Sequence, residues 1–452
     1  MIALRPKQLQ LVTDIREAMQ TSRSVLAVAA TGFGKTVVFC YLAHAVMQRG
    51  KRVYIIVHRD ELVDQVSKTL KDFGVEHGFI CAGRPVDPKP VMVCSVFTLA
   101  NRIDSYAAPD LLIIDEAHHA CSGSTWGRVL AAWQKSFILG VTATPIRLDG
   151  RDLSGHFGAM VEAPPIAELI EKGDLCKYRM YTPPVSLGKL RMRMGDYVKS
   201  DLVAAVDKPS VTGDAVAHYT KLAHGKRALA FCVSLEHAEH TRDAFRAAGY
   251  TSERIDGLLD RNARRAMVTA FSAGRIQVLT SCELVSEGFD LPAIEVAIML
   301  RPTASLGLYL QQVGRCLRPH PGKDYALILD HAGNAGTHGL PDDERQWSLG
   351  DDAASTRRKK ATASVRTCGK CYAAAKPGTM VCAYCGWKWP VEAREVAQVA
   401  GDLAEVTDVM RQRIEARREV GQSRTLDALI ALERQRGYRP GWAMHVHASR
   451  RR

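Results

Sequence analysis

The stretch V28-A-A-T-G-F-G-K-T-V-V-F39 decides the fold of the N-terminal half of this chain. An apolar run precedes it and a helix-like segment follows it. In a phosphate-binding loop between a strand and a helix, glycines let backbone N–H groups approach phosphates, a lysine reaches the β and γ phosphates, and a hydroxyl joins Mg²⁺. Gly32, Gly34, Lys35 and Thr36 can supply these parts, although the template G-x-x-x-x-G-K-[ST] has a glycine where this chain has Ala29.

A second candidate element is L111-L-I-I-D-E-A-H-H119, in which an apolar run ends in Asp115 and Glu116. A strand-terminal aspartate can hold hydrated Mg²⁺, and the adjacent glutamate can accept a proton from an attacking water. Both elements are expected at the carboxyl ends of strands, where open α/β sheets bind ligands. A polar loop is the plainer alternative, and the loop about 80 residues upstream argues against it. Metal binding by His118 and His119 is not favoured, because no second His or Cys group lies nearby in the sequence.

Short apolar runs alternate with helix-like segments in both halves of the chain, which is typical of parallel sheets covered by helices on both faces. The expected strands cover residues 25–30, 53–57, 91–95, 111–114 and 137–143, and then 228–233, 277–281, 296–300 and 325–330. This pattern predicts one α/β domain over residues 1–178 and a second over 179–345. The proline- and glycine-containing stretch 183–197 is expected to be a connector or a protruding accessory element between them.

A pair of arginines in the second half is a candidate for phosphate chemistry. Residues 311–318 read Q-x-x-G-R-x-x-R, and the spacing places Arg315 and Arg318 one turn apart on the same face of a helix. Two guanidinium groups can stabilise the charge that develops on a phosphoryl group in transfer, as an arginine finger does. An exposed basic helix is the alternative reading of the same residues.

The C-terminal quarter differs in composition from the rest. Residues 346–364 are polar and poor in core residues and are predicted to be a linker, in which the basic cluster 357–360 is read as a solvated run. A cysteine module is predicted over 365–392 and a basic helical tail over 393–452. Within this tail, 425–436 has helical apolar spacing, with Gly437 as the expected C-cap.

The cysteine module predicts a structural zinc site. Cys368 and Cys371 form one C-x-x-C pair, and Cys382 and Cys385 form another after ten intervening residues, a spacing typical of tetrahedral Zn²⁺. Four cysteine ligands leave no open position for catalysis, and the βαβ context of a redox pair is absent from the sequence pattern. The aromatic residues Tyr384, Trp387 and Trp389 are expected either to pack the module's own core or to stack on nucleobases, in which case the nearby Lys370, Lys376 and Lys388 would contact phosphates.

The overall charge and the remaining cysteines restrict the class of protein further. The 452 residues carry a formal net charge of +13 with a pI near 9.2, which favours nucleic acid as a partner over acidic proteins. Eight further cysteines are scattered, mostly among apolar neighbours, and are read as reduced core residues. The N-terminus does not have the pattern of a signal peptide, and no uncharged apolar run reaches about 18 residues. A cytoplasmic protein without membrane contact is expected.

These motifs, taken in order, resemble those of the superfamily 2 helicases. D115-E116-A117-H118 resembles the DEAH box, R5-P6-K7-Q8 the adenine-recognising Q motif, and T142-A143-T144-P145 motif III. Motifs Ia, Ib, IV and V have counterparts beginning at residues 57, 95, 231 and 280. The region 296–334 is similar to the RadD-like branch of bacterial and phage-encoded helicases, which is linked to DNA repair. The resemblance covers about three quarters of the chain and implies two tandem RecA-like domains, followed by the zinc ribbon and the tail.

The resemblance also implies roles for individual residues. ATP would be bound by residues of four segments: the phosphate loop, the Q motif, motif V and the segment 311–318. In this order they are Thr31, Gly32, Phe33, Gly34, Lys35 and Thr36; Arg5 and Gln8; Gly288 and Asp290; and Gln311. Lys35, Asp115, Glu116, Arg315 and Arg318 would carry the hydrolysis, with Mg²⁺ held through Thr36 and Asp115. His118, Thr142 and Thr144 would couple hydrolysis to movement of the domains.

The expected function is therefore that of an ATP-dependent DNA helicase or translocase in repair, recombination or phage replication. ATP, Mg²⁺ and Zn²⁺ are the expected cofactors, and single-stranded or branched DNA is the expected partner. Repair or replication proteins that dock on the C-terminal region are further candidate partners. RNA helicase, motor subunit of a restriction system, and nucleic-acid-binding scaffold switched by ATP are the alternatives. No nuclease motif such as P-D…(D/E)-x-K is evident in the sequence.

Overall fold

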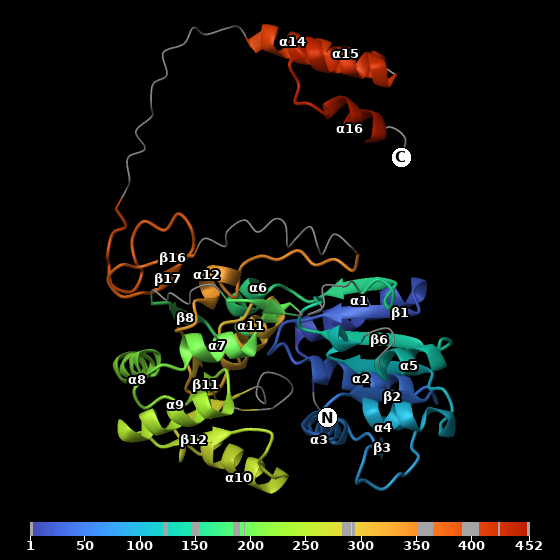
Figure 1. Ribbon diagram of the computed structural model, residues 1–452. Coiled ribbons are helices and arrows are strands. Elements are labelled where there is room, and N and C mark those ends of the chain that lie inside the picture. The colour runs from blue at the N-terminus through green and yellow to red at the C-terminus, as the bar shows by residue number, and fades with distance from the viewer. Residues whose placement is uncertain are drawn as a thin grey trace. The chain divides into compact units, whose positions relative to one another are not determined.

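Two parallel sheets form the framework of the N-terminal 389 residues (Figure 1). The computed structural model describes residues 3–120, 125–146, 153–183, 190–193, 195–282, 291, 294–350, 365–390, 406–423 and 425–449. The chain divides into two units, Met1–Trp389 and Pro390–Arg452. The predicted α/β fold with two RecA-like sheets is confirmed.

The first sheet has seven strands in the order β3-β4-β2-β5-β6-β1-β7, and all of its neighbouring strands are parallel. The strands are β1 Ser24–Val28, β2 Val53–Val57, β3 His77–Ile80, β4 Val91–Ser95, β5 Leu111–Asp115, β6 Phe137–Thr142 and β7 Ala159–Glu162. The central strands β2 and β5 are buried along their whole length, because helices cover both faces of the sheet. The edge strands β3 and β7 were not predicted. Each has only four residues, and neither contains a long apolar run like those of the central strands.

The helices of the first domain are α1 Pro6–Thr21, α2 Lys35–Met47, α3 Asp60–Asp72, α4 Val96–Asn101, α5 Thr125–Ala132 and α6 Ile166–Glu171. Helix α3 illustrates how they pack. Leu62, Val63, Val66 and Leu70 recur at helical spacing and are buried against the sheet, while acidic residues occupy the first turn. This periodicity is the sequence signal that separates the helices from the strands.

The second sheet has six parallel strands in the order β12-β13-β11-β14-β15-β8. They are β8 Tyr178–Tyr181, β11 Ala228–Phe231, β12 Ser252–Ile255, β13 Val278–Ser281, β14 Val296–Met299 and β15 Ala326–Asp330. The helices are α7 Lys199–Val206, α8 Pro209–Ala223, α9 Leu235–Ala247, α10 Arg261–Ser272, α11 Leu306–Cys316 and α12 Asn334–His338. A short hairpin, β9 Met192–Arg193 and β10 Asp196–Tyr197, lies in the expected connector, and Asp196 anchors it by accepting hydrogen bonds from the Ala304 backbone N–H and the Thr303 hydroxyl.

Direct contacts join the two sheet domains. Arg264 and Arg265 of α10 form ion pairs with Glu61 and Asp64 of α3, and the Arg265–Asp64 distance is 2.8 Å. The chain then returns from the second domain to the first, where the backbone N–H groups of Leu153 and Ser154 donate to the Leu349 carbonyl. The backbone at Leu349 is thus hydrogen-bonded to the first domain. The linker over residues 346–364 stays a prediction, since 351–364 lie outside the described residues.

The cysteine module is attached to the second sheet. Its two short antiparallel strands are β16 Arg366–Thr367 and β17 Ala374–Ala375. Ala373 forms a bridge to Tyr181 at the end of β8, and the Thr182 N–H donates to the Tyr372 carbonyl at 2.8 Å. Cys368, Cys382 and Trp389 belong to the same buried cluster as Leu327 and Leu329 of β15. The module is thus part of the second domain's core.

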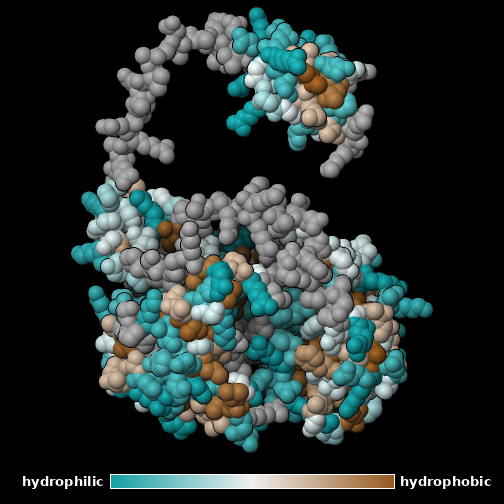
Figure 2. Space-filling model, in the orientation of Figure 1, coloured by the Kyte–Doolittle hydropathy of each residue, from teal (hydrophilic) through white to brown (hydrophobic). Residues whose placement is uncertain are grey.

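The described residues of the second unit form the helices α14 Val406–Gln422, α15 Leu426–Arg436 and α16 Trp442–Ser449. Thr425 caps α15 by accepting a hydrogen bond from the Ala428 N–H, and Gly437 ends it in the left-handed conformation at φ 65°. This is the helix and the C-cap that the sequence predicts. Hydrophilic residues cover much of the coloured surface in Figure 2, where hydrophobic patches lie between them. No helix among the described residues is both long and apolar enough to cross a membrane.

Candidate nucleotide-binding cleft

The loop between β1 and α2 has the backbone form that a phosphate site requires. Gly32 and Gly34 adopt φ values of 93° and 94°, which L side chains rarely adopt. Lys35 is the first residue of α2, and its Nζ donates to the Ala29 carbonyl at 3.3 Å. Ala29 is 2% exposed, and its N–H donates to the Thr142 carbonyl at 2.9 Å. Ala29 therefore directly follows the last residue of β1, and its φ is not positive, so glycine is not needed there.

Four charged groups surround the ammonium of Lys35. Burial lowers the pKa of Lys35, Glu116 and Asp115 raise it, and Arg315 and Arg318 lower it again. The two carboxylates come from the end of β5, and the two arginines come from the other domain. The fold thus gathers at one place the five residues to which the sequence assigned catalytic roles.

Asp115 and Glu116 form a buried carboxylate pair at the carboxyl end of β5, with 4% and 8% of their surfaces exposed. Burial, and then the charge of Glu116, raise the pKa of Asp115 to about 7, although Lys35 opposes this effect. Glu116 has φ 50°, an unusual conformation for a residue other than glycine. Its N–H donates to Asp115 Oδ1 at 3.0 Å.

His118 joins the carboxylate pair to the segment that follows β6. Its Nδ1 lies 3.4 Å from Glu116 Oε2 and 3.0 Å from Thr142 Oγ1. The Thr142 hydroxyl donates to the Thr144 carbonyl at 2.9 Å, and both threonines are buried. This chain of contacts connects Glu116 to Thr144, and a Cβ added to Gly307 on α11 of the second domain would lie only 2.8 Å from the Thr144 hydroxyl.

Helix α11 approaches the phosphate loop closely. A Cβ added at Gly314 would lie 2.4 Å from Thr31 Cβ, so only glycine permits this contact. Gln311 and Arg315 are buried beside it. The helix ends at Cys316, so Arg318 lies in the following turn and not on the helix face that the spacing predicted; it still reaches the loop, since a Cβ on Gly32 would lie 3.4 Å from Arg318 Cγ.

The Q-motif residues also contact the loop. Gln8 Nε2 donates to the Phe33 carbonyl at 2.9 Å, and the Arg5 guanidinium donates to the same oxygen. Arg5 also forms an ion pair with Asp174 at 2.9 Å. In this structure both side chains therefore hold the loop backbone, while the predicted adenine contact stays a prediction.

The remaining predicted site residues divide into two groups. Thr36 is partly exposed in the first turn of α2, where its hydroxyl accepts a hydrogen bond from Gln65 at 3.2 Å. Gly288 and Asp290 lie outside the described residues. Sequence reasoning missed Gly307 and Gly314 as contact residues; their spacing of seven, which places both on one face of a helix, is the signal that could have identified them.

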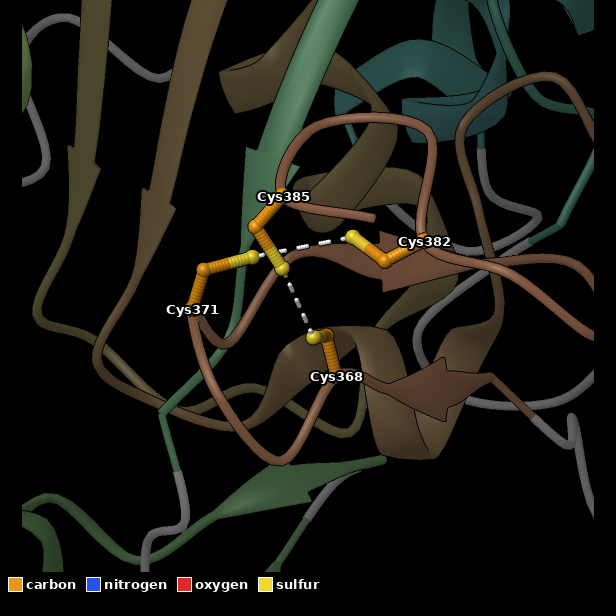
Figure 3. A group of neighbouring side chains, drawn as sticks. All are labelled: Cys368, Cys371, Cys382 and Cys385. Carbon is orange, nitrogen blue, oxygen red and sulfur yellow. Dashed lines mark hydrogen bonds between the residues drawn. The ribbon is translucent and has the colours of Figure 1, made fainter. Parts of the chain in front are cut away.

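The four cysteines converge as a metal site requires (Figure 3). Their sulfur atoms all lie within 4.8 Å of one another, with 3.5 Å between Cys368 and Cys385 and 3.7 Å between Cys371 and Cys382. Tetrahedral zinc with Zn–S bonds of about 2.3 Å requires sulfur separations of about 3.8 Å. The donor set therefore fits zinc, held by all four thiolates.

Comparisons with known proteins agree with this arrangement. Residues 1–147 match the family "Type III restriction enzyme, res subunit", and residues 211–320 match "Helicase conserved C-terminal domain". A 51.5 kDa protein of a Lactococcus phage is 32% identical over 363 residues, which cover 80% of this chain and 77% of the phage protein.

More distant relatives are longer than the shared region. The putative ATP-dependent helicase IRC3 of Saccharomyces cerevisiae is 28% identical over 71% of this chain, which spans only half of that relative's length. A fragment of a putative HsdR subunit of a type I restriction enzyme from Vibrio vulnificus superposes with a TM-score of 0.60 at 22% identity, covering 78% of this chain and 70% of the fragment. This likeness supports the two-domain fold.

Proposed function

Because the chain belongs to the superfamily 2 helicases, we propose that it is a motor that uses ATP hydrolysis to move along DNA, in repair, recombination or phage replication. The enzyme class, a nucleic-acid-dependent ATPase, follows from the family. The choice of DNA rests on two observations: the net charge of +13 and the likeness to restriction-enzyme subunits. Membership of the RadD-like branch is part of the same proposal.

The observation that carries the proposal is the cross-domain charge cluster around Lys35. One domain contributes Lys35, Asp115 and Glu116, and the other contributes Arg315 and Arg318. A phosphoryl group placed there would meet three cations, which stabilise the charge that develops during its transfer. Neither domain alone has the complete set, so the hydrolysis rate depends on how the domains meet.

Each side chain in the cleft has a role that its position supports. Lys35 binds the β and γ phosphates, Glu116 takes a proton from the attacking water, and Arg315 and Arg318 stabilise the leaving charge. Mg²⁺, held through Thr36 and Asp115, would neutralise phosphate charge when bound. Burial raises the pKa of Asp115, so a cation held beside this carboxylate would favour its charged form.

The coupling of hydrolysis to movement is assigned to the contact between Thr144 and Gly307. His118 and Thr142 connect Glu116 to Thr144, and Thr144 faces α11 of the second domain. A change at Glu116 during hydrolysis can therefore alter how α11 seats on the first domain. A strand held by both domains would move with each cycle.

Replacing Gly314 by alanine tests the closed contact. Since the new methyl carbon would lie 2.4 Å from Thr31 Cβ, α11 cannot approach the loop, and kcat is expected to fall at least about tenfold. Gly336→Ala is the matched control, because a Cβ at that helical position meets nothing within 4 Å. Steady-state phosphate release measures both variants. Equal ATPase rates for Gly314→Ala and Gly336→Ala would contradict a catalytic state in which α11 contacts the phosphate loop at Gly314.

The substrate class is tested by measuring the ATPase rate with single-stranded DNA, duplex DNA, forked DNA and RNA. The proposal expects the largest stimulation from single-stranded or forked DNA, and a triplex-displacement or strand-separation assay then reports directional work. A preference for RNA would overturn the DNA assignment. ATP binding without translocation or strand separation on any of these substrates would favour a scaffold switched by ATP.

A further inference from the structure

The cysteine module has basic residues but no acidic ones. Residues 365–390 contain Arg366, Lys370, Lys376 and Lys388 and no Asp or Glu. Four thiolates with one divalent zinc ion carry two negative charges, so the module has a net charge of about +2 when the metal is bound. Lys376 pairs with Asp342 at 3.0 Å, and Arg366 lies over the Trp389 ring, but Lys370 and Lys388 are exposed.

The aromatic residues of the module fall into two groups. Trp389 is 8% exposed and donates its indole N–H to the Thr367 carbonyl, and Trp387 packs beside Gly369 and against Trp389. These two residues form the module's core. Tyr372 and Tyr384, in contrast, are 37% and 43% exposed. Of the two roles that the sequence left open, core packing thus belongs to the tryptophans, and the tyrosines are available for contact with a ligand.

Tyr372 occupies a position where a glycine is expected. It follows the second cysteine of the first C-x-x-C pair, as Gly386 follows the second cysteine of the other pair. Both residues have positive φ, 61° for Tyr372 and 69° for Gly386. A tyrosine is strained in this conformation, whereas a glycine is not. Backbone strain at a residue whose side chain is exposed indicates that the side chain has a role other than folding.

The structural contacts of Tyr372 come from its backbone. Its N–H donates to the Cys368 carbonyl at 2.9 Å, and its carbonyl accepts from the Thr182 N–H. A glycine would keep both hydrogen bonds and relieve the strain. The ring of Tyr384 has a partner, since the Arg179 guanidinium lies 5.4 Å from its centre, but no ring or cation contact is recorded for Tyr372 among the described residues.

We propose that the zinc module binds a single nucleic-acid strand, with Tyr372 stacking on a base and Lys370 and Lys388 contacting phosphates. An exposed tyrosine ring, exposed lysine side chains and the lack of acidic residues within 365–390 suit a single strand, whose bases are open to stacking, better than a protein surface or a duplex. The proposal rests on the proposed motor function and adds a strand contact on the zinc module, beside the second sheet.

The test uses the full chain and measures the binding of a fluorescently labelled oligothymidine by anisotropy without nucleotide, with an oligouridine of equal length as the second arm. Tyr372→Gly is expected to weaken binding about 5- to 10-fold, while the zinc content and the basal ATPase rate without nucleic acid stay unchanged. Tyr372→Phe, which keeps the ring, should retain wild-type affinity. Lys370→Ala with Lys388→Ala should lower the salt dependence of binding, whereas the exposed control Lys221→Ala on α8 should not.

Wild-type affinity in Tyr372→Gly would overturn the strand-binding site, and the surface would then be tested for a protein partner. Loss of zinc in that variant would also overturn it, because the tyrosine would then have a structural role. A wild-type ATPase that does not respond to any nucleic acid would contradict the motor function itself. The outcomes for the site and for the motor are thus distinguishable. Weaker binding in both arms supports a strand contact that does not discriminate DNA from RNA.

Discussion

Replacing Glu116 by glutamine is expected to reduce ATP turnover about 1,000-fold or more while the protein still binds ATP. The amide has the same shape as the carboxylate but cannot accept the proton of the attacking water. Glu116 is 8% exposed, and its backbone N–H, which the substitution leaves in place, donates to Asp115 Oδ1. The fold and the nucleotide contacts should therefore survive the substitution.

Steady-state phosphate release at saturating nucleic acid measures the turnover of this variant, and a fluorescent ATP analogue measures binding. Glu17→Gln on the exposed face of α1 is the control for loss of a carboxylate and should have the wild-type rate. A Glu116→Gln variant that retains a tenth or more of the wild-type rate would remove Glu116 from the proton-transfer step. A variant that neither hydrolyses nor binds ATP would show that the carboxylate supports the site structurally.

Loss of zinc is expected to have the largest effect on stability. Cys368 and Cys382 lie in the same buried cluster as Leu327 and Leu329 of β15, and the module covers the edge strand β8. Structural zinc contributes binding free energy directly to folding, so the variant Cys382→Ser should lose the metal and unfold the module. The exposed edge of β8 and the lost packing should lower the melting temperature of the second domain by about 10 °C.

Zinc content per chain and thermal melting, with and without a strong chelator, test this expectation. Cys176→Ala is the matched control: Cys176 is buried, lies outside the cluster, and should keep one zinc per chain. The first domain should be unaffected, so that Cys382→Ser shows two separate melting transitions. Full zinc occupancy in Cys382→Ser, or melting that does not respond to the chelator, would contradict a structural zinc site.

Most of the local structure could be predicted because its signals lie close together in the sequence. The apolar run 25–30, the glycines at 32 and 34 and the helix from Lys35 form one continuous element, so a short window identifies the phosphate loop. The same is true of Asp115 and Glu116 at the end of β5, and of the two C-x-x-C pairs. The prediction that Arg318 lies on the same helix as Arg315 was wrong, because α11 ends at Cys316.

Other features depend on contacts between distant residues and had no local signal. The ion pairs of Arg264 with Glu61 and of Arg265 with Asp64 join positions about 200 residues apart. The Phe33 carbonyl that Gln8 and Arg5 share was not foreseen, since a backbone acceptor has no sequence signature. The packing of the cysteine module on β8 was missed for the same reason.

The sequence by itself determined the chemistry of this protein, because the residue types that handle phosphate, protons and zinc occur in short, ordered motifs. Ala29, which departs from the glycine template, directly follows β1, where glycine is unnecessary. Only the tertiary structure decided how the motifs work together. It brings Arg315 and Arg318 to Lys35 from another domain, seats Gly314 on Thr31, and separates the buried tryptophans of the zinc module from its exposed tyrosines. These relations depend on which surfaces meet when the sheets and helices pack, and no local pattern contains that information.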